Sequence, residues 1–126
     1  MRMRVFQTRP FARFARHEGI IDEELCEAVR QAASGLIDAD LGGGVIKQRL
    51  RRPGQGKSGG FRSILLFRKG SKAFFVYGFA KNDRDNIRPD ELRAFRKLAG
   101  VMLTLDEKAL VAAIKNGTIM EVECHG

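Results

Sequence analysis

The sequence has no tryptophan, a single tyrosine and only two cysteines among its 126 residues. Small secreted domains are usually held by several disulfides, so two isolated cysteines far apart in the chain, Cys26 and Cys124, do not indicate a disulfide scaffold. No apolar run approaches the roughly 20 residues that a membrane-spanning helix needs. The basic start of the chain, Met1 to Arg4, is not followed by the apolar segment of a signal peptide. We therefore expect a protein of the reducing cytoplasm with no membrane partner.

Acidic residues are also few: 15 Asp and Glu stand against 23 Lys and Arg, which gives a formal net charge of +8. Such an excess in a short chain predicts a polyanionic partner, either nucleic acid or a membrane surface, and the lack of membrane features favours nucleic acid. The alternative is that the excess serves only solubility. Hydrophobic residues make up 44% of the chain, an ordinary content that argues against general disorder. The length predicts a single domain over residues 1–126.

The apolar periodicity predicts an α+β fold. Two short N-terminal helices form a hairpin, the first capped by Thr8 and ended by Gly19. The second is capped by Asp22 and stopped by Gly35. Alternating segments predict an antiparallel meander of three to five strands, followed by helices that begin at Pro89 and after Asp106. The expected strands are residues 45–51, 61–68 and 73–80, with shorter ones at 5–8 and at a 118–123 edge, and the expected aromatic core is Phe11, Phe14, Phe74 and Phe95.

The densest cluster of positive charge lies in residues 45–62, which we name the basic ribbon. Its first strand alternates, so that one face carries cations and the other carries apolar or amide side chains. Like charges at every second residue repel one another, which favours a phosphate-binding surface over a merely solvated strand face. The glycines of residues 53–60 let a backbone approach an anion closely. The cations are Lys47, Arg49, Arg51, Arg52, Lys57 and Arg62, with Lys47, Arg49 and Arg51 on one face and Ile46, Gln48 and Leu50 on the other.

A nucleotide-binding motif within the ribbon is incomplete. Gly56, Lys57 and Ser58 match the last three positions of a Walker A loop, but the first glycine of that motif would fall on Arg51. A phosphate-binding loop must also open a helix, whereas a strand follows here. Nucleotide hydrolysis is therefore excluded, and no small-molecule cofactor is expected.

Residues for acid–base catalysis are scarce near the ribbon. The ribbon contains no histidine and no close pair of carboxylates. At the other end of the chain, Cys124 and His125 lack the two further ligands of a structural zinc site, so no metal is expected. Lysine and arginine must then carry any chemistry, because a lysine crowded by cations exchanges protons near neutral pH and arginine stabilises a charged phosphate transition state. Tyr77 either stacks on a base or is a core tyrosine, and Lys81 extends the phosphate-binding surface.

Two segments resemble the toxins of the RelE/HigB kind, within the RelE/ParE superfamily of bacterial toxin–antitoxin systems. The first is GGGVIKQRLRRPGQGKSGGFR, residues 42–62, and the second is FVYGFAKNDRDNI, residues 75–87. The resemblance covers the middle third of the chain, and the flanking helices fit the order of elements in the family. It implies an antiparallel sheet flanked by helices, ribosome-dependent cleavage of mRNA by attack of the ribose 2′-hydroxyl, and an antitoxin partner that covers the basic surface.

The same resemblance implies roles for individual residues. Lys47 or Lys57 transfers the proton, while Arg62 and Arg49 hold the scissile phosphate. Several members of the family carry a catalytic Tyr or His near the C-terminus, where this sequence offers only His125. The matching positions are Lys47, Arg49, Lys57, Arg62 and Lys81. Two other readings stay open: a basic RNA- or DNA-binding regulator without catalysis, and a protein whose charge serves only to dock an acidic antitoxin.

Overall fold

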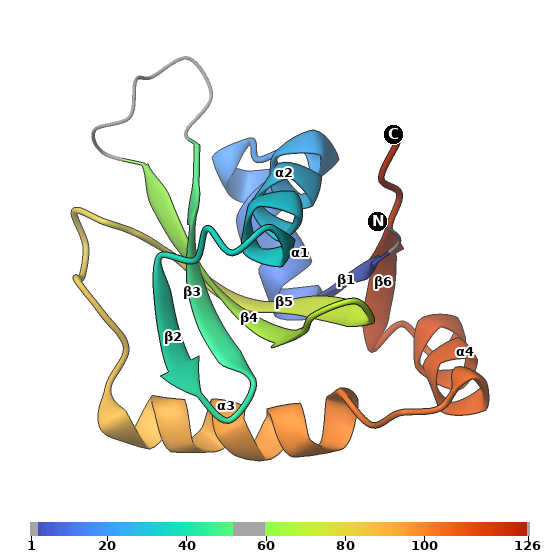
Figure 1. The fold of residues 1–126 in the computed structure, drawn as a ribbon. Coiled ribbons are helices and arrows are strands. Elements are labelled where there is room, and N and C mark those ends of the chain that lie inside the picture. Colours follow the sequence, from blue (N-terminus) through green and yellow to red (C-terminus); the bar gives the residue numbers. More distant parts are fainter. Residues whose placement is uncertain (1–2, 52–59, 126) are drawn as a thin grey trace.

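The computed structural model describes residues 3–51 and 60–125, and it places helices on both sides of a central sheet (Figure 1). The N-terminal helices α1 and α2 cover one face of the sheet, and α3 lies across the other. In chain order the elements are β1 (Arg4–Thr8), α1 (Arg9–Glu18), α2 (Asp22–Ala33), β2 (Ala39–Gly42), β3 (Val45–Leu50), β4 (Phe61–Arg68), β5 (Lys72–Ala80), α3 (Pro89–Met102), α4 (Glu107–Lys115) and β6 (Ile119–Val122).

The sheet confirms the predicted α+β class and its helix order. Among the described residues it has six strands in the order β2-β3-β4-β5-β1-β6, one strand more than the largest number predicted. The additional strand is β2, whose sequence Ala-Asp-Leu-Gly carries little strand preference. All neighbouring strands are antiparallel except β1 and β5, which pair in parallel. Residues 39–80 therefore form an antiparallel meander from β2 to β5, while β1 and β6 extend the sheet beyond β5.

The helix ends follow the predicted capping chemistry in most places. The Thr8 hydroxyl accepts a hydrogen bond from the Phe11 amide at 3.4 Å, and Gly19 ends α1 with a left-handed φ of 73°. Asp106 caps α4 in the same way. The prediction for α2 was wrong by one residue: Asp22 is its first residue rather than its cap, where its charge still favours the positive end of the helix dipole.

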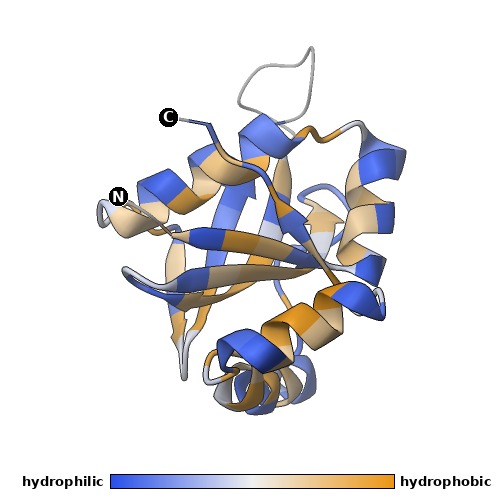
Figure 2. Cartoon of the chain, turned by 90° about the vertical axis from the view of Figure 1, so that its right-hand side faces the viewer, coloured by the Kyte–Doolittle hydropathy of each residue, from blue (hydrophilic) through white to orange (hydrophobic). Residues whose placement is uncertain are grey.

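Two hydrophobic clusters hold the helices to the sheet, one on each face. On the α1 and α2 side, Phe11 and Phe75 are buried together, with Phe14 packed against them. On the α3 and α4 side, Phe74 is buried and Phe95 packs at the edge. Figure 2 shows the sheet between these helices, with polar residues on much of the outer surface of the helices. None of the helices among the described residues has the length and apolar composition needed to cross a membrane.

The two cysteines, which the sequence suggested were isolated, form a disulfide between α2 and the segment after β6. Cys26 is buried on α2, and its Cα lies 5.7 Å from that of Cys124 despite 98 residues of separation. The reason is topological. Strand β6 adds to the sheet beside β1, and the chain that follows it passes α2, which no spacing rule in the sequence indicates.

Candidate functional site

The strand register brings two arginines of the basic ribbon together. Arg49 on β3 lies directly opposite Arg62 on β4, so their side chains share one face of the sheet. Lys47 lies two residues before Arg49 and therefore faces the same way. We call Lys47, Arg49 and Arg62 the basic face. The intervening residue, Gln48, is buried on the opposite face as the alternation predicted.

The three members of the basic face differ in exposure. The Arg62 side chain is 12% exposed, whereas the Arg49 side chain is 67% exposed. Lys47 is half-buried, and among the described residues it makes no ion pair. One arginine is therefore held within the protein surface while its neighbour reaches into solvent, an arrangement able to hold an anion between a fixed and a movable donor.

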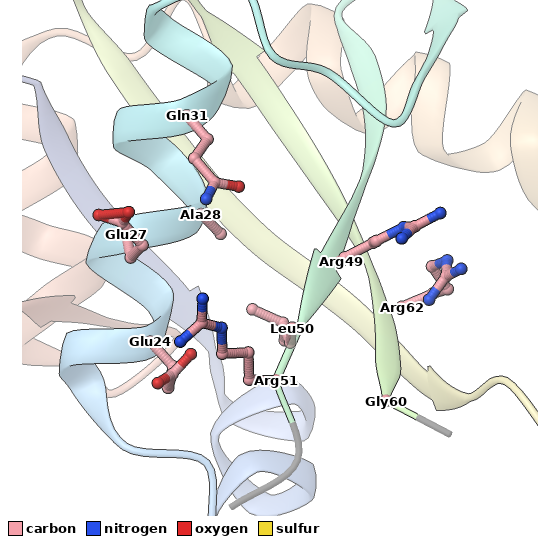
Figure 3. A pocket seen from close by; sticks show the side chains of 9 residues that line it. All are labelled: Glu24, Glu27, Ala28, Gln31, Arg49, Leu50, Arg51, Gly60 and Arg62. Atoms are coloured by element: carbon pink, nitrogen blue, oxygen red, sulfur yellow. The ribbon is translucent and has the colours of Figure 1, made fainter. Parts of the chain in front are cut away.

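The other predicted site residues are placed in different ways. Lys81 follows β5, and its backbone amide donates to the carbonyl of Gly60, so it lies at the same end of the sheet as Arg62. Arg51 lies beyond the end of β3, and Figure 3 shows its side chain toward Glu24 of α2, away from Arg49. The single predicted face of Lys47, Arg49 and Arg51 thus splits, because the alternation of a strand does not continue past its end. Arg52 and Lys57 lie outside the described residues.

A pocket of about 270 Å³ lies between α2 and the ends of β3 and β4 (Figure 3). One wall is acidic or amide-bearing and comes from α2; the other comes from the strands and is basic. Figure 3 shows the side chains of Arg49 and Arg62 next to each other, on the side of β3 that faces away from α2. The lining residues are Glu24, Glu27, Ala28, Gln31, Arg49, Leu50, Arg51, Gly60 and Arg62.

A carboxylate that the sequence analysis missed stands against the basic face. Asp38 has one carboxylate oxygen 3.5 Å from Nε of Arg49 and the other 3.4 Å from Nε of Arg62. It precedes β2, which folds back on β3 at the turn of residues 42–44. Glycines at that turn were the available signal, since a hairpin there pairs Ala39 with Lys47 and so carries Asp38 toward Arg49.

Tyr77 faces the α3 side of the sheet and is held by Arg84. Its hydroxyl accepts a hydrogen bond from Arg84 Nη1 at 3.0 Å, and the guanidinium lies 5.7 Å from the ring centre. Phe79 and Phe95 pack against the same ring. The tyrosine is therefore satisfied within the protein, in keeping with the core alternative and leaving little open ring for a base.

Arg84 also pairs with Glu91 on α3, with Nη2 at 2.6 Å from Oε1. The hydrogen bond from Arg84, together with one from the backbone N–H of Arg88, lowers the pKa of Glu91. The hydrogen bond to Glu91 in turn raises the pKa of Arg84. This pairing fixes the loop after β5 to the start of α3, beside the basic face.

Neither histidine lies at the basic face. His125 follows Cys124, which the disulfide holds to α2 at the β6 side of the sheet, whereas β3 lies toward the other edge. His17 is exposed near the end of α1. Among the described residues, no group of three or more His, Cys, Asp or Glu side chains is placed to hold a metal ion. Within residues 3–51 and 60–125, the basic face offers for chemistry the amine of Lys47, the guanidiniums of Arg49 and Arg62, and the carboxylate of Asp38.

Comparison with known proteins identifies the family of this chain. A family model described as the RelE toxin of the RelE/RelB toxin–antitoxin system matches residues 3–122, nearly the whole chain. A search of curated proteins gives no match.

Proposed function

This chain belongs to the RelE toxin family of the RelE/RelB toxin–antitoxin system, and we propose that it is a ribosome-dependent endoribonuclease that cleaves mRNA and so inhibits translation. Toxins of this family are typically endoribonucleases, and a RelE toxin has a cognate antitoxin as its partner. The observation that carries the proposal is the pairing of Arg49 with Arg62 on one face of the sheet, with Lys47 on the same face. We place this single domain, residues 1–126, in the cytoplasm with the ribosome.

The proposed reaction is an internal transfer at one phosphate of the RNA. The ribose 2′-oxygen loses its proton and bonds to the adjacent phosphorus, while the bond from phosphorus to the next 5′-oxygen breaks and that oxygen gains a proton. The products are a 2′,3′-cyclic phosphate and a 5′-hydroxyl end. The phosphate gains negative charge on the way, and two guanidiniums stabilise that charge more than they stabilise the ground state.

Individual roles follow from placement. Arg62 and Arg49 hold the scissile phosphate. Lys47, on the same face, is our candidate for proton transfer; Lys57 is the alternative from the sequence. Lys81 binds a neighbouring phosphate at the same end of the sheet, and Arg51 binds the RNA from the α2 side of the pocket. Arg52 and Tyr77 complete the RNA-binding set, Tyr77 through its edge because Arg84 covers its ring.

The acidic binding segment of an antitoxin suits the same surface. Its carboxylates compete with RNA phosphates for Arg49 and Lys81, both exposed cations. An antitoxin bound there excludes the RNA, which is how we propose that the toxin is held inactive.

The decisive experiment is cleavage of mRNA by the purified protein on purified, translating ribosomes. The wild type is expected to cut mRNA within codons and to arrest growth when it is expressed. Lys47→Ala and Arg62→Ala are each expected to reduce cleavage at least about 100-fold, because each removes a group that acts at the reacting phosphate. Arg62→Lys keeps the positive charge but lacks the planar guanidinium donors, so it is expected to retain only a small part of the wild-type cleavage rate.

The matched control is Arg93→Ala, which removes an equal charge from the exposed surface of α3 and is expected to cleave like the wild type. Full cleavage by the Lys47→Ala, Arg62→Ala double variant would refute the assigned site. Tight RNA binding with no cleavage on ribosomes would instead favour the non-catalytic regulator. If the basic surface binds the antitoxin but no RNA, the positive charge serves only to dock the antitoxin.

A further inference from the structure

The position of Asp38 is unusual because its negative charge lies where a substrate phosphate must bind. Its side chain is 20% exposed and lies within 3.5 Å of both arginines of the basic face. A carboxylate there weakens the attraction of the face for RNA. A residue that opposes binding and is nevertheless built into the site needs another explanation, and the geometry supplies one.

Asp38 is anchored by a buried polar network. Its backbone N–H donates to Oε1 of Gln48 at 2.8 Å, and Gln48 is only 2% exposed. Gln48 in turn donates from Nε2 to the carbonyls of Ala28 and Leu36, at 3.0 and 3.1 Å. Ser63, opposite Gln48 in the sheet, donates to the Gln48 carbonyl. The backbone at Asp38 is therefore fixed to α2, β3 and β4 together.

The carboxylate of Asp38 approaches both arginines at Nε rather than at their Nη groups. In both arginines the nitrogen nearest to Asp38 is Nε, and within the described part of the chain neither guanidinium donates a hydrogen bond through Nη. The distances of 3.4 and 3.5 Å are those of ion pairs rather than of tight hydrogen bonds. Figure 3 shows the two guanidiniums side by side.

Two arginines at directly paired strand positions repel each other, and without a counter-charge they would turn apart. We propose that Asp38 is a positioning residue that holds Arg49 and Arg62 in the side-by-side orientation in which their Nη groups bind one phosphate. The proposal rests on the proposed function for its effect on cleavage, but the orientation of the arginines does not depend on that function. Asp38 itself does not touch the reacting atoms.

This role separates binding from turnover. Asp38→Asn removes a negative charge beside the phosphate, so the KM for the ribosome–mRNA complex is expected to fall or stay unchanged. It also frees both guanidiniums, so kcat is expected to fall about 10- to 100-fold, the scale expected when a catalytic group is misplaced by about 1 Å. Asp38→Glu restores the charge with a longer side chain and is expected to recover part of kcat.

Asp40→Asn is the matched control. It makes the same charge change two residues along, and the asparagine oxygen keeps the bond that Asp40 accepts from the Gly42 amide. It is expected to leave kcat and KM at wild-type values. Asp38→Asn keeps the backbone bond to Gln48, so its folded fraction, measured by circular dichroism, is expected to match the wild type.

A second readout needs no catalysis. In ¹⁵N NMR of the free protein, the Nε–Hε signals of Arg49 and Arg62 are expected to be well ordered in the wild type and averaged toward free arginine in Asp38→Asn, with Asp40→Asn unchanged. Identical Arg49 and Arg62 signals in the wild type and Asp38→Asn would overturn the positioning role. So would an unchanged kcat, or a loss of kcat no larger than the loss of folded protein. Failure of the wild type to cleave would refute the proposed function alone, and the NMR result would still decide the role of Asp38.

Discussion

At the scale of single residues, the ion pair of Arg84 with Glu91 stabilises the fold next to the basic face, where it joins the loop after β5 to α3. Glu91 accepts from Arg84 and from the backbone amide of Arg88, and both bonds lower its pKa. A carboxylate whose pKa is lower in the folded state stabilises the fold above its unfolded pKa of about 4.3, and that contribution is lost as the pH falls through the folded pKa.

Glu91→Gln keeps an oxygen for the Arg88 amide but removes the charge that Arg84 pairs with. It is expected to lower the free energy of unfolding by about 1 kcal/mol at pH 7, since the pair is only partly exposed. The difference from the wild type should shrink as the pH falls below about 4, as urea titrations at several pH values would show. Asp90→Asn lies on the same helix turn but removes a pair with the exposed Arg88, so it is expected to lower the free energy of unfolding by less. A difference that grows at low pH would contradict the assignment.

The residues of the site differ in how far the sequence could place them. Lys47 and Arg49 were predictable as neighbours on one face because the alternation of a strand depends only on local spacing. The position of Arg49 opposite Arg62 depends on the β3–β4 register, which the loop between the strands does not specify. Asp38 was not predicted because the strand that follows it, β2, is short and contains Asp and Gly.

At the scale of elements, α1 packs so closely on β5 that one position admits no side chain. A Cβ on Gly78 would lie far inside van der Waals contact with the Phe14 ring. That ring packs between Phe11 and Phe61, with ring centres 5.8 and 5.6 Å away, so it has little room to move. Glycine at position 78 therefore sets the distance between the helix and the sheet.

Gly78→Ala is expected to lower the free energy of unfolding by about 1–3 kcal/mol, the usual cost of overpacking a core. Gly100→Ala is the control, because Gly100 lies in α3 with open space at its Cβ position. That change is expected to stabilise the protein by up to about 1 kcal/mol, through helix propensity alone. Chemical denaturation of the two variants measures both values, and equal effects of the same sign would contradict the close packing at Phe14.

At the scale of the whole molecule, the disulfide between Cys26 and Cys124 links two cysteines that are 98 residues apart in the sequence. Restricting so long a segment of the unfolded chain is worth about 4–5 kcal/mol by the loop-entropy estimate. Reduction is therefore expected to lower the free energy of unfolding by up to that amount, a large part of the total for a small domain. In a reducing cytoplasm the bond is expected to be open, so the reduced form is the one to test for activity.

Denaturant titration with and without a thiol reductant measures this difference. Cys124→Ser is the suitable variant because Cys124 is exposed, whereas serine at position 26 would place a polar hydroxyl at a buried position in the core. The free energy of unfolding of this variant is expected to equal that of the reduced wild type and to be the same with and without the reductant. A wild type whose stability does not change on reduction would show that the bond contributes nothing to the fold in solution.

The net charge of +8 is also a property of the whole molecule, and its distribution decides what it does. If RNA binds through the basic face and Lys81, each of the four cations displaces condensed counterions from the RNA, including the two arginines that share the scissile phosphate. With a contribution of about 0.7 per phosphate for single strands, the logarithm of the binding constant should fall with the logarithm of salt concentration with a slope of about −3 or steeper. Arg49→Ala, at an exposed position, should reduce that slope by about 0.7.

The contrast with Arg93→Ala tests whether binding is local. Arg93 contributes equally to net charge but lies on α3, and a partner held by the basic face leaves it in solvent. Its removal is therefore expected to leave the slope unchanged, when binding of an unstructured RNA oligonucleotide is followed by fluorescence anisotropy at several salt concentrations. If Arg93→Ala and Arg49→Ala lower the slope equally, RNA is attracted by charge spread over the surface, and the paired arginines are not a phosphate site.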